Sequence, residues 1–164
     1  MSTPIVDPNS ALFLVALSEN TVHGSGPNGE VPTAAASVGL TFDERRRLRS
    51  LKARAAIVMH YGGNHWSKAQ VEGLSSQFRD LGVEVVAVTD AGFRAEKQIA
   101  DLAAVLAERP DVIVSIPTDV IATAPAYRAV VDAGVKLVFM DNVPQGFRSG
   151  KDYVSSVAAD NMGG

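Results

Sequence analysis

Short apolar runs alternate with longer amphipathic stretches from about residue 54 to the end of the chain. The apolar runs are nearly continuous, as in strands that are buried on both faces of a sheet, and they span residues 55–61, 83–90, 111–117, 136–142 and 153–161. The stretches between them repeat apolar residues three or four positions apart, as helices do, and they span residues 67–82, 94–110 and 119–134. This alternation predicts an α/β fold, with an open parallel sheet and helices on both of its faces.

Glycine, proline and capping residues mark the ends of the predicted helices. Gly82 and Gly134 are typical helix stops, and Pro110 ends the middle helix. Asp119 is the expected cap of the last helix, and Pro125 inside that helix implies either a late first turn or a kink.

Residues 1–52 have a different texture and are interpreted as an irregular leader. Residues 21–32 are dense in Gly and Pro and predict a loop. Within this loop, residues 24–29 match the spacing G-x-G-x-x-G of a dinucleotide-binding turn. The residues that follow are Glu-Val-Pro, whereas such a turn must lead directly into a helix. The match therefore favours a linker over a nucleotide site.

A basic helix is predicted near residues 41–52. Thr41 and Glu44 have the spacing of a capping box, and leucines recur on one face of the segment. The run "DERRRLRSLKAR" is either a nucleic-acid-binding arm or a solvated helix face. The solvated face is favoured, because the 164-residue chain carries a net charge of −3 and no aromatic residue interrupts the arginines.

The composition narrows the classes of function. The chain has no cysteine, which excludes disulfides, thiol nucleophiles and cysteine-based zinc sites. The apolar run at residues 11–18 is far shorter than a membrane span, and no Lys or Arg precedes it, so it is interpreted as a strand or short helix. No nucleic acid, cofactor or direct membrane span is expected.

Polar and aromatic residues gather where the predicted strands end, in "HYGGNHW", "TDAGF", "SIPTD", "DNVPQ" and "ADN". In parallel sheets these ends lie at one edge, where ligands bind. Trp66, the only tryptophan, stands at a strand-to-helix junction, where its ring could cover the C–H face of a sugar while Asn64 hydrogen-bonds its hydroxyls. The alternative is that Trp66 is a packing residue that covers the start of the helix.

Metal binding and catalysis have weaker support. His60 and His65 lack a third ligand at a diagnostic spacing. No G-x-S-x-G nucleophile motif occurs. Aspartates follow several of the predicted strands, which leaves an acid/base pair open, although Asp in such places is also a common cap or turn residue. These aspartates are Asp90, Asp119, Asp141 and Asp160.

Five segments in this order resemble the type I periplasmic binding proteins of sugar ABC transporters, the ribose-binding-like group. They are "GGNHWSKAQVEG", "VTDAGFRAEKQIADL", "DVIVSIPTD", "AVVDAGVKLVFMDN" and "VSSVAADNMGG". The resemblance implies that Asn64, Trp66 and Asp141 contact the sugar. The position after the acidic residue is often Arg in that family and is Asn142 here, and the often polar position before Pro117 is Ile116. With these differences, a different sugar or a sugar alcohol is as well supported as ribose.

The resemblance also implies the function: the solute-binding component of an ABC importer, periplasmic or extracellular, that clamps its ligand between two lobes and is not an enzyme. Residues 53–164 are then expected to form the N-terminal lobe, with the chain stopping before the second. The candidate ligand-binding residues are Asn64, Trp66, Asp90, Asp119, Asp141 and Asn142. Two alternatives stay open, the effector-binding core of a sugar-responsive transcription regulator and a small α/β enzyme that uses strand-end aspartates.

Overall fold

The computed structural model describes residues 25–26, 28–34 and 37–158. The chain divides into two compact units, residues 1–40 with 160–164, and Thr41–Ala159. In the first unit the described residues include a turn, in which the Gly26 N–H donates to the Glu30 carbonyl at 2.7 Å. This agrees with the predicted loop. The apolar run at residues 11–18 and Asp160 lie outside the described residues.

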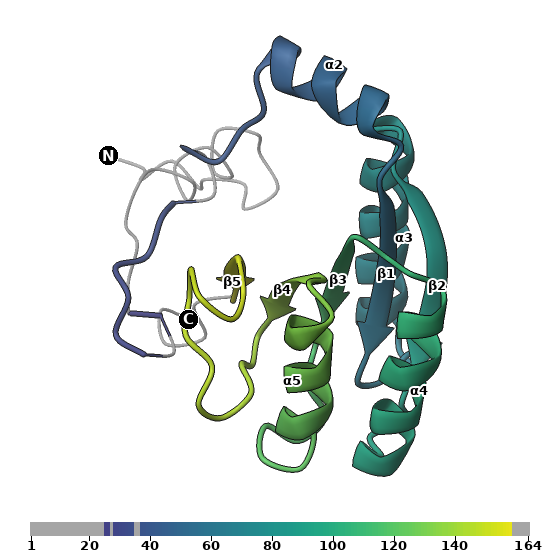
Figure 1. Ribbon diagram of the computed structural model, residues 1–164, viewed down its shortest axis with the longest axis vertical. Coiled ribbons are helices and arrows are strands. Elements are labelled where there is room, and N and C mark those ends of the chain that lie inside the picture. Colours follow the sequence, from purple (N-terminus) through teal and green to yellow (C-terminus); the bar gives the residue numbers. More distant parts are fainter. Residues whose placement is uncertain (1–24, 27, 35–36, 159–164) are drawn as a thin grey trace, which may run out of the picture. The chain divides into compact units, whose positions relative to one another are not determined.

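The second unit is built on a five-stranded parallel sheet (Figure 1). Its strands are β1 (Arg54–Met59), β2 (Glu84–Asp90), β3 (Val112–Ser115), β4 (Lys136–Met140) and β5 (Ser155–Val157). They lie in the order β2-β1-β3-β4-β5, and every pairing is parallel. The predicted open parallel sheet is confirmed, although β5 is shorter than the apolar run at 153–161 that predicted it.

Helices cover both faces of the sheet, as predicted. The elements that follow β1, β2 and β3 are α3 (His65–Asp80), α4 (Ala95–Ala107) and α5 (Ala124–Asp132). One face of the sheet packs against apolar residues of α3 and the other against those of α4 and α5 (Figure 1). The central strands β1 and β3 therefore bury both of their faces, which explains why they are nearly continuous in apolar residues, whereas β2 and β5 keep exposed positions.

Two helices begin at other residues than the sequence predicts. α3 begins at His65 rather than at residue 67, because Asn64 caps it. α5 begins at Ala124, with Pro125 in its first turn, so the late start is confirmed and not the kink. Asp119 is not the cap of α5: its Oδ1 accepts the N–H groups of Ile121 and Ala122, in the turn before the helix. Pro125 is tolerated in the first turn of α5 because the N–H groups of a first helical turn have no partner within the helix.

The basic segment forms α2 (Phe42–Leu51), at the end of the sheet where β1 begins (Figure 1). The predicted capping box is present: the Thr41 hydroxyl accepts the Glu44 N–H, and the Glu44 carboxylate accepts the Thr41 N–H. Arg49 donates to the carbonyl of Asp80 at the end of α3. None of the residues of α2 is buried, as expected of a solvated helix.

Aromatic residues fill the core under α4 and α5. Phe139 of β4 makes edge-on contacts with three other rings, at centroid distances of 5.2, 6.1 and 5.5 Å. These rings belong to Tyr127, Phe147 and Tyr153. The Tyr127 hydroxyl shares a hydrogen bond of 2.6 Å with the Ser115 hydroxyl, which in turn donates to the Val58 carbonyl. This packing holds β1, β3 and β4 in place beneath their carboxyl ends.

Candidate functional site

The carboxyl ends of β1 and β3 form the point where the chain reverses its direction of winding. From β1 the chain crosses to β2 on one side and then to β3 on the other side of β1. The loops that leave β1 and β3 therefore diverge toward opposite faces of the sheet. In parallel sheets with helices on both faces, ligands bind in the crevice that this divergence opens.

A group of four rings lies at the end of β1, contributed by His60, Tyr61, Trp66 and Phe93. His60 is flanked edge-on by Trp66 and Phe93, at centroid distances of 6.4 and 5.1 Å. Tyr61 stacks on Phe93 at 4.6 Å. Trp66 and Phe93 are nonetheless 46% and 60% exposed. Two large apolar faces are thus held in place by other rings while remaining open to a ligand.

The two glycines after β1 leave space that neighbouring side chains occupy. A Cβ at Gly63 would come within 2.2 Å of the Tyr61 hydroxyl. A Cβ at Gly62 would come within 2.8 Å of a carboxylate oxygen of Asp90. The glycines therefore leave room for Tyr61 and the end of β2 to pack over the turn.

Asn64 and Trp66 both belong to the start of α3. The Asn64 Oδ1 accepts the Ser67 N–H at 2.7 Å, so this oxygen caps the helix. The amide nitrogen of Asn64 is the group that it can still offer to a ligand. Trp66 follows in the first helical turn, and its ring lies against His60 rather than in the core. The cap therefore sets the direction in which Trp66 projects.

The carboxylates of the three aspartates at the strand ends differ in the number of hydrogen bonds that they accept. The Asp90 Oδ1 accepts the Gly92 N–H, and the Asp119 Oδ1 accepts two N–H groups of its own turn. Asp141 is exposed at the end of β4 with a φ of +59°, and its carboxylate has no hydrogen bond or ion pair among the described residues. Non-glycine residues in this backbone region gather at functional sites. Asn142, also exposed, donates its backbone N–H to the Met140 carbonyl, and its side chain has no hydrogen bond to any residue that the structure describes.

Gln98 of α4 holds the loop that leaves β3. Its side chain is fully buried. The Gln98 Nε2 donates to the Ile116 carbonyl at 2.8 Å, and its Oε1 accepts the Thr118 N–H at 2.7 Å. These two bonds give the loop the hydrogen-bond partners that a strand would supply. Gln98 therefore positions Thr118 and Asp119 at the edge of the crevice.

Buried side-chain atoms without a hydrogen-bond partner gather at this same edge. In the part of the chain that the structure describes there are four, and all lie at or next to the carboxyl ends of β1, β2 and β3. They are His60 Nδ1, Ser67 Oγ, Thr89 Oγ1 and Thr118 Oγ1. Such atoms are costly unless a ligand, water or rearrangement supplies a partner. The edge is therefore the part of the sheet whose polar groups are least satisfied.

The environment of His60 favours a neutral ring. Burial among the neighbouring rings lowers the pKa of His60 below its ordinary value, and the carboxylates of Asp141 and Asp90 oppose this only in part. A neutral imidazole has one donor and one acceptor nitrogen. His60 can therefore hydrogen-bond a ligand without bringing a positive charge to the site.

This pKa shift predicts how stability depends on pH. Above the ordinary histidine pKa of about 6.5, folded and unfolded chains both hold a neutral His60. As the pH falls below that value, the unfolded chain takes up the proton more readily, so the free energy of unfolding should decrease. Urea unfolding at about pH 7.5 and about pH 5.5 measures this decrease, which should be smaller in His60→Gln. His65→Gln, at an exposed histidine, is the control. An unchanged decrease in His60→Gln would contradict the assignment.

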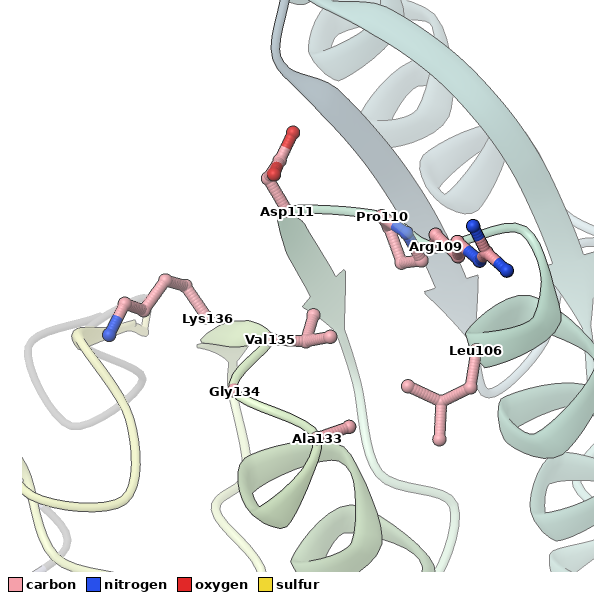
Figure 2. Close-up of a pocket in the computed structure, with 8 residues that line it drawn as sticks. All are labelled: Leu106, Arg109, Pro110, Asp111, Ala133, Gly134, Val135 and Lys136. Carbon is pink, nitrogen blue, oxygen red and sulfur yellow. The ribbon is translucent and has the colours of Figure 1, made fainter.

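Two hollows differ in what they offer a ligand. A hollow of about 540 Å³ lies at the other edge of the sheet, where β3 and β4 begin (Figure 2). Leu106, Ala133 and Val135 point into it, whereas Lys136 extends away from it (Figure 2). A smaller hollow of about 280 Å³ lies between α3 and the end of β2, and Asp90 and Ser67 are among the residues that line it. Only the smaller hollow adjoins the edge with the rings, the carboxylates and the unpartnered atoms.

The described residues contain no group of three His, Asp or Glu side chains that could hold a metal ion. His60 and His65 therefore gain no third ligand within that part of the chain. Among the described helices, none combines the length and the apolar character that a membrane crossing needs.

The structure brings most of the predicted residues to one edge. Asn64, Trp66, Asp90, Asp119 and Asp141 with Asn142 all lie at the carboxyl ends of the strands, as predicted. The sequence does not predict the other residues of this edge, and it indicates His60 only as a candidate metal ligand. These other residues are Tyr61, Ser67, Thr89, Phe93, Gln98 and Thr118. The quoted run "TDAGF" did contain one signal, since a Phe beside a glycine turn suggests an exposed ring.

Comparisons with known proteins agree with this architecture. A family model described as "Periplasmic binding protein domain" matches residues 55–163. No curated protein sequence is significantly similar to the chain. The structure is similar to the Caulobacter myo-inositol binding protein bound to myo-inositol, at 28% identity and a TM-score of 0.58, over 68% of this chain and 36% of that one.

Two solute-binding proteins of ABC transporters from Agrobacterium vitis show the same fold. One contains bound allitol; it is 23% identical with a TM-score of 0.57, and the match covers 68% of this chain and 36% of that one. The other contains bound alpha-D-tagatopyranose; it is 24% identical with a TM-score of 0.58, and the match covers 68% of this chain and 39% of that one. The chain thus spans less than half the length of these relatives. All three relatives are binding proteins. Because the family model matches residues 55–163, most of the chain, the chain belongs to the periplasmic binding protein family.

Proposed function

We propose that this lobe binds a sugar or polyol at the carboxyl edge of its sheet and serves as part of the solute-binding component of an ABC importer. The observation that carries the proposal is the combination at one edge of open aromatic faces, Trp66 and Phe93, with polar groups that lack partners. Sugars present apolar C–H faces and a rim of hydroxyls, so they need both kinds of contact.

Within this site Trp66 stacks on the ligand, while Asp141 and Asn142 accept and donate hydrogen bonds to its hydroxyls. The Asn64 amide nitrogen, Asp90 and Asp119 complete the polar rim. Support for this ligand class comes from the myo-inositol bound to the Caulobacter relative. A second lobe closes over the ligand, as the greater length of the relatives suggests. The importer's membrane subunits then recognise the closed form, in the periplasm or outside the cell.

Titration calorimetry on the intact protein tests this function. Myo-inositol and allitol are suitable probes, because one is a ring and the other an open chain with the same numbers of carbons and hydroxyls. We expect saturable binding of at least one of them. Asp141→Asn should weaken it about tenfold, the cost of losing a charged hydrogen-bond acceptor. Lys136→Ala, at the opposite edge, is the control.

The proposal predicts that Lys136→Ala leaves the affinity unchanged. Two results would contradict it: no binding of either probe by the folded protein, or an equal loss of affinity in Lys136→Ala and Asp141→Asn. The second result would place the ligand elsewhere than at the carboxyl edge.

A further inference from the structure

Two carboxylates at the carboxyl edge of the sheet lack a cationic partner in the part of the chain that the structure describes. Asp90 ends β2 and Asp141 follows β4, and each carboxylate is near enough to His60 to oppose the lowering of its pKa. The ion pairs of the described residues all lie elsewhere. The edge therefore carries negative charge that the described residues do not neutralise.

The positive side chains of this edge leave the two carboxylates available. Lys68 and Arg94 lie at the starts of α3 and α4, and both are exposed. Neither forms an ion pair with a described residue. The residue after Asp141 is Asn142, which is neutral. A ligand that brings its own positive charge would therefore find both carboxylates unpaired.

The open rings at the same edge suit the same charge. A cation is attracted to the face of an aromatic ring within about 6 Å of its centroid. The Arg128 guanidinium lies in this way 4.2 Å from the centroid of Phe147. Trp66 and Phe93 are largely exposed, and among the described residues no Lys or Arg lies over either ring. Open rings beside unpaired carboxylates favour an ammonium group over a neutral hydroxyl.

A buried hydroxyl beside Asp90 is an independent sign of a ligand. Ser67 is fully buried, and its Oγ has no hydrogen-bond partner within the described residues. Asp90 pairs with Met59, whose side chain packs on the α3 face of the sheet, so the Asp90 side chain lies on that face too. Ser67 and Asp90 line the same hollow of about 280 Å³. The Ser67 hydroxyl can therefore accept an N–H from an ammonium group that Asp90 attracts.

We propose that the ligand of this site carries an ammonium group and is an amino sugar or an amino polyol. This inference rests on the proposed function and narrows its ligand class. The carboxylates of Asp90 and Asp141 attract the ammonium group, while the carbon skeleton stacks on Trp66 and turns its hydroxyls to the polar rim. A sugar acid, which is negatively charged, is repelled by the same carboxylates.

Titration calorimetry on the intact protein compares matched neutral and charged probes. The pairs are myo-inositol with 1-amino-1-deoxy-myo-inositol, and allitol with 1-amino-1-deoxyallitol; in each pair an ammonium group replaces one hydroxyl. At about pH 7 we expect the amine of at least one pair to bind about fivefold or more tightly than its neutral partner. Raising the salt concentration from about 20 mM to about 500 mM should remove most of this preference, because salt screens charges at an exposed edge.

Aspartate variants locate the charge that is responsible. Asp90→Asn and Asp141→Asn each remove one charge with little change of shape. We expect at least one of them to reduce the ratio of amine affinity to neutral affinity about threefold or more. A merely structural role would weaken both probes equally and leave this ratio unchanged. Asp132→Asn, at an exposed aspartate that ends α5 at the opposite edge, is the matched control and should not change the ratio.

The outcomes separate this inference from the proposed function. If wild type binds the neutral probes as tightly as the amines in both pairs, the inference is overturned and the proposed function stands. If wild type binds none of the four probes, the proposed function fails, and the inference fails with it. A preference for amines that persists at high salt, or that neither Asp90→Asn nor Asp141→Asn reduces, would also overturn the inference.

Discussion

Replacing Gln98 by leucine should lower the free energy of unfolding by about 2–5 kcal/mol. Leucine fits the buried space but makes neither of the two hydrogen bonds of the amide. The Ile116 carbonyl and the Thr118 N–H would both lose their partners, and each such loss costs about 1–3 kcal/mol when the group stays buried. The effect is large because one fully buried side chain satisfies two backbone groups of the loop that leaves β3.

Urea unfolding of Gln98→Leu against wild type measures this effect. Gln77→Leu is a matched control on the exposed surface of α3 and should change the free energy of unfolding by less than about 0.5 kcal/mol. The variant should also bind ligand less tightly, since Thr118 and Asp119 would no longer be held at the crevice. A Gln98→Leu protein as stable as wild type would mean that the loop finds other partners and that Gln98 does not position it.

Trp66→Ala should weaken binding of a sugar or polyol about tenfold or more while leaving the fold intact. Loss of an aromatic face from a stacked contact costs about 1–3 kcal/mol by comparison with stacked bases. The cost to stability should stay below about 1 kcal/mol, because nearly half of the Trp66 side chain is exposed and its ring lies outside the two core clusters.

Calorimetry with myo-inositol, together with thermal unfolding, separates these two effects. Trp66→Phe keeps an aromatic face and should recover part of the affinity. Phe42→Ala removes an even more exposed ring, from α2, and should have no effect on binding. Unchanged affinity in Trp66→Ala would rule out stacking and favour the alternative in which Trp66 only covers the start of α3.

The architecture was accessible from the sequence because each element carries its own local signal. The central strands β1 and β3 are buried on both faces, so their apolar runs are continuous. The Thr41–Glu44 capping box also appears in the structure as predicted. Local signals were less decisive at helix starts. Asn64 was interpreted as a ligand contact, and its capping role explains why α3 begins two residues early.

The arrangement of the site was less accessible, because it depends on contacts between distant segments. Phe93 reaches His60 and Tyr61 only because β1 and β2 pair in parallel and because the backbone at Phe93 adopts a φ of +59°. Gln98 and the loop after β3 that it hydrogen-bonds are likewise far apart in sequence, because the rest of α4 and all of β3 lie between them. The spacing of residues within one helix or strand cannot predict such contacts between distant segments. The ends of the strands were nonetheless correctly expected to carry the polar residues.

The central claim is that ligand binds at the carboxyl edge of this sheet. Amide hydrogen exchange of the intact protein, with and without saturating myo-inositol, tests it most directly because it locates the ligand without any substitution. Slower exchange is predicted at residues 60–67, 90–94, 116–119 and 141–142. Slower exchange confined to residues 106–111 and 133–136, around the hollow at the opposite edge, would contradict the claim.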